Sequence, residues 1–266
     1  MSSPNAACPA CGGNGGPTAG GKRQICVQCS TIWVPSRRGY TYDDTYPEQR
    51  AHHDVVVSRC KQVTLDGWVR RTGVKLPGRR VLEVGFGGGA TLEWLQGQGA
   101  VVSGQEPVAA NRDAAVRLGI PAANLAADLA DFQGRCFDLL VYLDSFEHLP
   151  DPAAHLALLA PLTGQASQAL VVLPVSDSFS RRLLGRAWPH DIADHWVFYS
   201  TRGLAELWRR SGWRVAQRFY PWKYVSALTL ARHWHNKTGM AVPLAGLANT
   251  GVWLNFGERG LLFERL

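Results

Sequence analysis

Along most of the chain, short apolar runs alternate with stretches in which apolar residues recur at helical spacing. The runs predict buried strands at 80–84, 100–104, 137–143 and 169–173. The helical stretches predict helices at 90–98, 108–118, 152–162 and 201–211. This alternation of strands and helices is typical of α/β folds with a parallel, doubly wound sheet.

Weaker patterns flank this core. Residues 124–127 predict a short third strand, and residues 213–220 and 260–264 predict the final two strands. Residues 54–73 predict a helix that packs on the α/β domain. Residues 222–250 interrupt the last strand pair and predict a helical insertion that covers the sheet edge or an oligomer face. A substrate lid or a peripheral membrane contact is the alternative for this insertion.

Length and composition divide the chain into three parts. Its 266 residues fit one α/β domain with a small appendage. We expect residues 1–35, which are rich in Gly, Pro and Cys, to form the appendage. Residues 36–76 are expected to form a linker and a helical segment, and residues 77–266 the α/β domain. No run reaches the ~18 apolar residues of a membrane span, and the first residues lack the layout of a signal peptide. We therefore expect a cytoplasmic protein.

Four of the six cysteines form two pairs near the N-terminus, with 14 residues between the pairs. Each C-x2-C pair can form a turn that places two thiolates on one ion. The pattern therefore predicts a zinc ribbon, with redox thiols or an iron–sulfur centre as alternatives. Because four thiolates leave no open coordination position, the ion is expected to be structural. The predicted ligands are Cys8, Cys11, Cys26 and Cys29.

The formal net charge of +7 is consistent with an anionic partner. A nucleic-acid binder more often shows a dense basic stripe with interleaved aromatic residues. In this chain the basic residues are scattered. The charge therefore favours solvated faces and leaves nucleic acid as an alternative partner.

A glycine-rich turn, Gly85-Phe86-Gly87-Gly88-Gly89, follows the first strand. Because parallel sheets bind ligands at the carboxyl ends of their strands, this turn predicts a cofactor cradle. Gly85 permits a tight turn, Gly87 lets a ligand approach the backbone, and Gly89 permits close strand–helix packing. Glu106 follows the second strand, where a carboxylate can accept hydrogen bonds from both ribose hydroxyls. Together these features predict a nucleoside cofactor.

Glu83 distinguishes between the nucleoside cofactors. The turn also fits the dinucleotide pattern G-x-G-x-x-A, so NAD is an alternative. A carboxylate directly before the glycines suits the cationic amino-acid end of S-adenosylmethionine, and it would repel a pyrophosphate. The chain also lacks a later Tyr-x-x-x-Lys or comparable hydride-transfer set. These features favour S-adenosylmethionine.

Three segments carry a family resemblance, the last of which is His195-Trp196-Val197-Phe198-Tyr199-Ser200 with the helix that ends at Gly212-Trp213. Residues 81–89, Val-Leu-Glu-Val-Gly-Phe-Gly-Gly-Gly, resemble motif I of class I methyltransferases. Phe137-Asp138-Leu139-Leu140 with the later Glu147-His148-Leu149-Pro150-Asp151-Pro152 is similar to the "FD…EHL.DP" segment of small-molecule methyltransferases. That group includes ubiquinone-biosynthesis O-methyltransferases and sugar C-methyltransferases. The resemblance covers roughly residues 76–220 and the final strand, and it implies a Rossmann-like, seven-stranded sheet whose last strand inserts antiparallel.

The resemblance also implies roles for single residues. Asp128 becomes the candidate partner of the adenine amino group, while Leu143 and Asp144 are expected to line the cofactor. With the residues of the turn, the expected cofactor-binding set is Glu83, Gly85, Phe86, Gly87, Gly89, Glu106, Asp128, Leu143 and Asp144.

Four residues are candidates for catalysis. Methyl transfer is an in-line displacement in which the protein mainly orients the acceptor, but a hydroxyl or carbon acid can need a general base. His148 follows the fourth strand at the mouth of the expected cleft, and its alternative role is to hold the strand–helix turn. His190, Asp191 and His195 follow the fifth strand, where each can contact substrate or cap loop backbone.

The sequence thus predicts a methyltransferase acting on oxygen or carbon of a small molecule, such as a metabolite, a sugar or lipid-linked intermediate, or a natural product. An RNA methyltransferase that docks its substrate through the ribbon and basic surface is the main alternative. The ribbon does not discriminate between a small-molecule and an RNA methyltransferase. Sugar C-methyltransferases and one type of ribosomal-RNA methyltransferase both carry N-terminal zinc modules. A non-catalytic binding module and an NAD enzyme are further alternatives. The sequence leaves the acceptor and the oligomeric state open.

Overall fold

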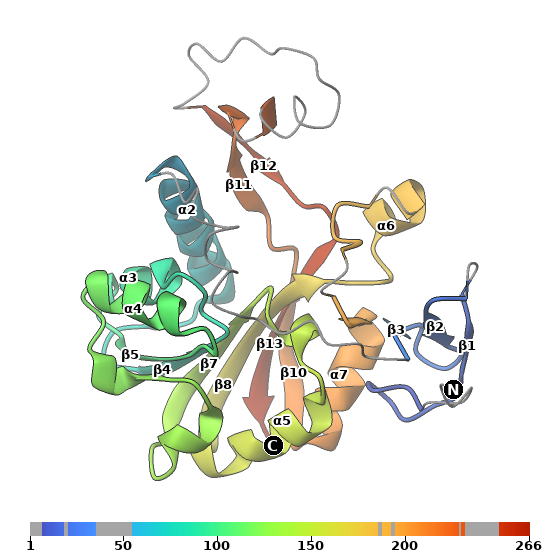
Figure 1. The fold of residues 1–266 in the computed structure, drawn as a ribbon, viewed down its shortest axis with the longest axis horizontal. Coiled ribbons are helices and arrows are strands. Elements are labelled where there is room, and N and C mark those ends of the chain that lie inside the picture. The colour runs from blue at the N-terminus through green and yellow to red at the C-terminus, as the bar shows by residue number, and fades with distance from the viewer. Residues whose placement is uncertain are drawn as a thin grey trace.

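A seven-stranded sheet forms the centre of the protein (Figure 1). The structure, a computed structural model, describes residues 7–18, 21–35, 55–185, 188–192, 195–228, 230–231 and 250–266. The strand order is β10-β13-β8-β7-β4-β5-β6. In chain order the strands are β4 (Arg80–Val84), β5 (Val101–Gln105), β6 (Leu125–Ala126), β7 (Phe137–Leu143), β8 (Thr163–Pro174), β10 (Trp213–Phe219) and β13 (Glu258–Arg265).

The strand directions confirm the predicted fold class. β4 pairs in parallel with both β5 and β7, and β7 pairs in parallel with β8. β13 is antiparallel to both of its neighbours, β8 and β10. The reason lies in the preceding pair, β11 (Lys223–Ser226) and β12 (Gly251–Leu254), which rises above the sheet (Figure 1). The chain therefore enters β13 from the edge at which β7 and β8 end, and it runs against them.

Helices cover both faces of the sheet, because successive residues of each strand point to opposite sides. Val81 packs in one apolar cluster with residues of α2, α3 and α4, while Leu82 packs in another with residues of α5 and α7. The helices are α2 (Val55–Thr72), α3 (Ala90–Gly97), α4 (Ala109–Arg117), α5 (Pro152–Leu159), α6 (Phe179–Leu184) and α7 (Thr201–Arg210). Among the described helices, none combines the length and apolar character that a membrane span requires.

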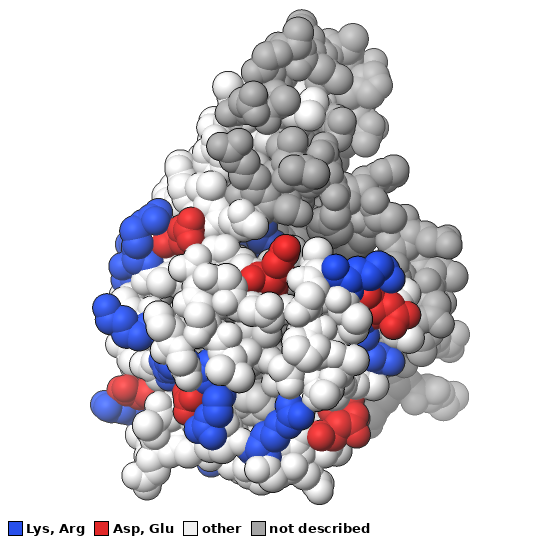
Figure 2. All heavy atoms as spheres, turned by 90° about the vertical axis from the view of Figure 1, so that its left-hand side faces the viewer, with Lys and Arg blue, Asp and Glu red and all other residues white. Residues whose placement is uncertain are grey.

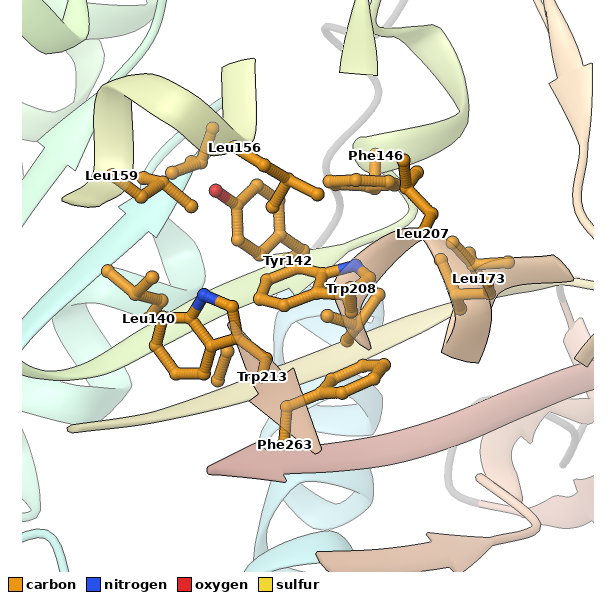
Figure 3. Packing of buried hydrophobic residues seen from close by; sticks show 14 of the residues in the cluster. Leu140, Tyr142, Phe146, Leu156, Leu159, Leu173, Leu207, Trp208, Trp213 and Phe263 are labelled. Atoms are coloured by element: carbon orange, nitrogen blue, oxygen red, sulfur yellow. The ribbon is translucent and has the colours of Figure 1, made fainter. Parts of the chain in front are cut away.

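Aromatic side chains fill the core beneath α7 (Figure 3). Trp208 stacks on Phe263 of β13, with ring centroids 4.5 Å apart. It makes edge-to-face contacts with Trp213 and Tyr142, at centroid distances of 5.4 Å and 5.9 Å. All four side chains are fully buried. This packing fixes α7 against the antiparallel end of the sheet.

The N-terminal segment is joined to the α/β part by a shared sheet. The strands β1 (Gly15–Pro17), β2 (Gln24–Cys26) and β3 (Ile32–Trp33) continue into β9 (Val197–Phe198), which directly precedes α7. Ser200, the N-cap of α7, donates a hydrogen bond to the Cys29 carbonyl. Ser176 Oγ donates to the Ser30 carbonyl at 2.8 Å. The ribbon segment is therefore anchored at the start of α7.

Several predicted boundaries shift in the structure. β8 begins at Thr163, six residues before the predicted strand, because its first half pairs with β7 and Gln168 also meets β13. The predicted helical insertion at 222–250 begins with the strand β11, and β12 follows directly after it. Residues 227–228 and 230–231 are helical, as predicted, while residues 229 and 232–249 lie outside the described residues. The predicted linker residues 36–53 also lie outside them.

Candidate functional site

A cavity of about 390 Å³ opens where β4, β5 and β7 end. The carboxyl ends of these parallel strands meet at one edge of the sheet, the usual ligand position in such folds. The glycine turn after β4 forms one side of the cavity, and the loop after β7 forms another. The lining residues are Val84, Gly85, Gly87, Gln105, Glu106, Pro107, Ala127, Asp128, Asp144, Ser145, His148, Leu149 and Pro150.

Three of the four glycines of the turn, Gly85, Gly87 and Gly89, have different roles. All three have a positive φ, of 70° at Gly85, 59° at Gly87 and 86° at Gly89. Residues that carry a side chain rarely adopt this backbone conformation. A Cβ at Gly85 would lie 2.7 Å from Ser145 Cβ, and one at Gly89 would lie 2.8 Å from Ala115 Cβ. Gly87 lines the cavity, and a Cβ added there would meet no heavy atom within 4 Å. Gly85 and Gly89 therefore permit close packing, and Gly87 leaves backbone open toward the cavity.

Glu106 ties the turn to β5. Its Oε2 accepts a hydrogen bond from Gly87 N at 2.9 Å, and its Oε1 accepts one from Val108 N at 3.1 Å. The carboxyl group is 5% exposed and lines the cavity. Each oxygen retains a lone pair, so Glu106 can accept hydrogen bonds from a ligand while it holds the turn.

Glu83 is a buried carboxyl group in β4, one residue before the end of the strand. It is 2% exposed, and its Oε2 meets no hydrogen-bond donor among the described residues. Burial raises the pKa of Glu83 to about 7, although the charge of Lys61 and the hydroxyl group of Thr91 act in the opposite direction. A buried carboxyl oxygen that lacks a hydrogen-bond donor is costly. A cation bound beside it would supply the missing partner.

Of the four remaining predicted cofactor residues, two line this cavity and two do not. Asp128 lines it and caps the following turn, where its Oδ1 accepts from Ala130 N at 2.9 Å. Asp144 lines it and has a positive φ of 53°. Leu143 lines a neighbouring cavity instead. Phe86 is 3% exposed and packs in the core.

The four predicted catalytic residues do not converge on one point. His148 lines the cofactor cavity, and its ring centroid lies 4.7 Å from that of His195. Burial, followed by the charges of His148 and His190, lowers the pKa of His195 to about 3, so its imidazole is neutral. His190 Nε2 lies 3.2 Å from Glu258 Oε1. Asp191 pairs with Arg23 of the ribbon segment at 2.6 Å.

A charged network beside the cavity was not predicted from the sequence. Lys223 Nζ, at the start of β11, lies 2.7 Å from Asp144 Oδ2 and 3.0 Å from Glu258 Oε1. Burial opposes ionisation of Glu258, but Lys223 and His190 outweigh it and hold the pKa at about 2. The available signal was Glu258 itself, a carboxylate just before the apolar run 260–263, since a charge entering a buried strand needs a partner. Nothing in the sequence identified Lys223 as that partner.

The four N-terminal cysteines converge. Their sulfur atoms all lie within 4.8 Å of one another, with Cys8–Cys29 at 3.7 Å and Cys11–Cys26 at 3.5 Å. A tetrahedral ion with Zn–S bonds of about 2.3 Å requires sulfurs about 3.8 Å apart. The donor set therefore fits a four-thiolate metal ion.

A second group of side chains with potential metal-ligand atoms lies beside this cavity. Glu147, His148 and His195 each offer one potential ligand atom, and these three atoms lie within 4.8 Å of one another. Glu147 and His195 are buried. Trp196 N donates to the Glu147 carbonyl at 3.2 Å, which joins this group to β9 and, through it, to the ribbon.

A comparison with protein families identifies the chain. A family model described as a methyltransferase domain matches residues 61–218, more than half of the chain. The chain belongs to this methyltransferase family. The match contains the glycine turn, Glu106 and the loop after β7, which are the elements that form the cavity.

Curated relatives match a shorter stretch. The ubiquinone biosynthesis O-methyltransferase of Hahella chejuensis is 34% identical over 92 residues, which are 32% of this chain and 39% of that protein. The Azotobacter vinelandii enzyme of the same description is 36% identical over 89 residues, 30% of this chain and 38% of its own length. The chain thus spans about two fifths of the length of these relatives.

Solved structures support the same fold. A magnesium protoporphyrin IX methyltransferase from Synechocystis PCC 6803 with bound SAH superposes with a TM-score of 0.51. The two are 16% identical, and the superposition covers 87% of this chain and 90% of the other. At this identity the likeness shows the methyltransferase fold.

Proposed function

We propose that the protein transfers a methyl group from S-adenosylmethionine to an oxygen atom of a small-molecule acceptor. The observation that carries this proposal is Glu83, a buried carboxyl group in β4, two residues before Gly85, whose Oε2 meets no hydrogen-bond donor among the described residues. A ligand with a cationic amino-acid end satisfies that carboxyl group, whereas a pyrophosphate would be repelled by it. Oxygen is favoured over carbon because the curated relatives are named O-methyltransferases.

The cavity residues divide the work of holding the cofactor. The Gly87 backbone faces its amino-acid end, Glu106 accepts hydrogen bonds from the ribose, and Asp128 faces the base. Glu83 is not among the lining residues and contributes its charge from within β4. When bound, S-adenosylmethionine supplies a methyl group on a positively charged sulfonium. The chain orients the acceptor oxygen and excludes water. His148 is the candidate general base, since it is the predicted catalytic residue that lines this cavity.

Calorimetric titration tests the proposal directly. S-adenosylmethionine and S-adenosylhomocysteine should bind with one site per chain, and NAD should not. His148→Ala should slow transfer and leave cofactor affinity unchanged. Absence of S-adenosylmethionine binding would favour a non-catalytic module, and binding of NAD in its place would favour a dehydrogenase.

We also propose that Cys8, Cys11, Cys26 and Cys29 hold a structural zinc ion. The sulfur spacing supports it, and four thiolates leave no position for a substrate. Residues 1–35 are then the ribbon, 36–76 the linker and helical segment, and 77–266 the methyltransferase domain. Elemental analysis should find one zinc per chain, and Cys11→Ser should lose it while Cys136→Ser keeps it.

One observation favours RNA as a second candidate acceptor. A groove of about 860 Å³ beside the ribbon is lined by Arg202, Arg209, Arg214 and Arg218. Two of these are paired, Arg209 with Glu206 and Arg214 with Glu264. On the face in Figure 2, basic and acidic residues are interspersed, which also favours a small molecule. RNA binding that weakens steeply with salt would reverse this preference.

A further inference from the structure

A second cavity adjoins the first at Asp144, which lines both. It measures about 300 Å³ and lies between α2 and β11. Leu65, Trp68, Leu143 and Val225 make much of its wall apolar. Because the two cavities meet at one side chain, a molecule in the second can approach a methyl donor in the first. Its volume is at the lower end of the range for small-molecule sites.

Two hydrogen bonds hold the walls of this second cavity together. Tyr224 N donates to Thr64 Oγ1 at 2.8 Å, and Trp68 Nε1 donates to the Trp222 carbonyl at 3.0 Å. They join α2 to the segment that carries Lys223. The position of Lys223 is therefore fixed by the wall of the cavity as well as by its ion pairs.

Lys223 is the polar centre of the junction. Its ammonium group is bound by Asp144 at 2.7 Å and by Glu258 at 3.0 Å, and Glu258 is 1% exposed. These carboxylates raise the pKa of Lys223 against the effect of burial, so the group stays protonated. An ammonium group has three donors, and the two carboxylates account for two of them. Among the described residues, the other charged or titratable groups nearby are His190, which faces Glu258, and Cys60, Lys61 and Tyr224, which line the cavity.

We propose that Lys223 binds the acceptor, donating its third hydrogen bond to the oxygen that receives the methyl group. This inference rests on the proposed methyl transfer and assigns its acceptor subsite to the cavity between α2 and β11. The ammonium N–H donor stabilises an oxygen that gains negative charge as its proton passes to His148, the candidate base, and as the methyl group passes from the sulfonium sulfur to that oxygen. A largely apolar wall with the ammonium groups of Lys223 and Lys61 suits an apolar molecule with an acidic hydroxyl group.

The test uses 4-nitrophenol, whose ionised form absorbs visible light, with the full chain saturated by S-adenosylhomocysteine. Titration of the bound probe should give a pKa lower than in water, by about one unit, a tenfold change in its ionisation. Lys223→Met should remove the shift, and Lys223→Arg should retain most of it. Lys75→Met, which removes an exposed lysine after α2, should leave it unchanged. With an acceptor that is turned over, Lys223→Met should raise KM more than Lys75→Met does.

Three results would overturn the assignment. The first is an equal shift of the probe's pKa in Lys223→Met and in the parent protein. The second is loss of this shift in Lys61→Met instead of Lys223→Met. The third is failure of the parent protein to bind the probe. Melting temperatures of Lys223→Met and Lys223→Arg separate a folding defect from a binding defect. Cofactor calorimetry on the same variants separates the two proposals. If S-adenosylmethionine binds and the probe does not shift, only the Lys223 assignment fails. If S-adenosylmethionine does not bind, methyl transfer fails as well.

Discussion

At the scale of single residues, Glu83 links protonation to binding. With a pKa of about 7, raised by burial, the free carboxyl group is close to half ionised at neutral pH. A cationic ligand interacts with the carboxylate and not with the neutral acid. Below pH 7 the protein must therefore release a proton to bind the cation, and above it the group is already ionised.

This linkage gives a pH-dependent affinity. The association constant for S-adenosylmethionine should rise with pH up to about 7, approaching tenfold per unit at the acidic end, and then level off. Glu83→Gln should bind more weakly and should lose the slope. Calorimetry between pH 5.5 and 8, values chosen to bracket the pKa of about 7, measures both. Glu93→Gln, which changes an exposed carboxyl group on α3, is the matched control, and an unchanged slope in Glu83→Gln would exclude this role.

Gly87 permits a second residue-scale test. Its added Cβ would meet no protein atom within 4 Å, so Gly87→Val should fold, at a cost of about 1–2 kcal/mol for its positive φ. The side chain would occupy the path of the ligand, and we expect at least a tenfold loss of S-adenosylmethionine affinity. Gly88→Val is the control, because a Cβ there also meets nothing and its φ is not positive. Equal affinities of the two variants would contradict the proposed approach of the ligand to Gly87.

At the scale of elements, the ribbon and α7 depend on each other. Ser200 caps α7 and also donates to Cys29, and a Cβ at Gly203 would lie 2.2 Å from Thr31 Oγ1 and 3.1 Å from Cys29 Sγ. The first turn of α7 therefore packs directly on the segment that carries the proposed zinc ligands. Loss of the ion would remove the support of this turn.

Metal removal should consequently destabilise more than the ribbon. Chelation, or Cys8→Ser, should lower the melting temperature by at least several degrees, because structural zinc contributes directly to folding. The loss should appear in the summed fluorescence of the ten tryptophans, to which Trp208 on α7 in the main core contributes. Cys136→Ser, outside the cluster, should melt like the parent protein. A melting temperature unaffected by chelation would show that the cysteines fold without metal.

The sequence predicted the elements that bury one continuous apolar face and missed those that depend on distant partners. β7 was predicted with its exact bounds because it is buried on both sides, and the cysteine cluster followed from spacing alone. β9 is two residues long and exists only because β3 pairs with it. Lys223 and Glu258 are far apart in sequence and meet through the β11–β12 pair, so no local pattern could join them.

At the scale of the whole molecule, one core crosses the predicted domain boundary. Cys8, Ala10 and Trp33 of the ribbon belong to the same buried cluster as Leu204 and Trp208 of α7. Separate domains would each bury a core of their own. The methyltransferase part and the ribbon should therefore unfold together.

Calorimetry of the metal-loaded protein should accordingly show a single transition whose calorimetric and van't Hoff enthalpies agree. S-adenosylmethionine should move that transition upward by binding the native state, and chelation should move the same transition downward. Trp33→Ala should lower its midpoint, since it removes a buried side chain from the junction, whereas truncation of the exposed Val27 should have little effect. Two resolved transitions, with only one responding to the cofactor, would mean that the ribbon folds independently and that its contacts with α7 add little to the stability of the catalytic sheet.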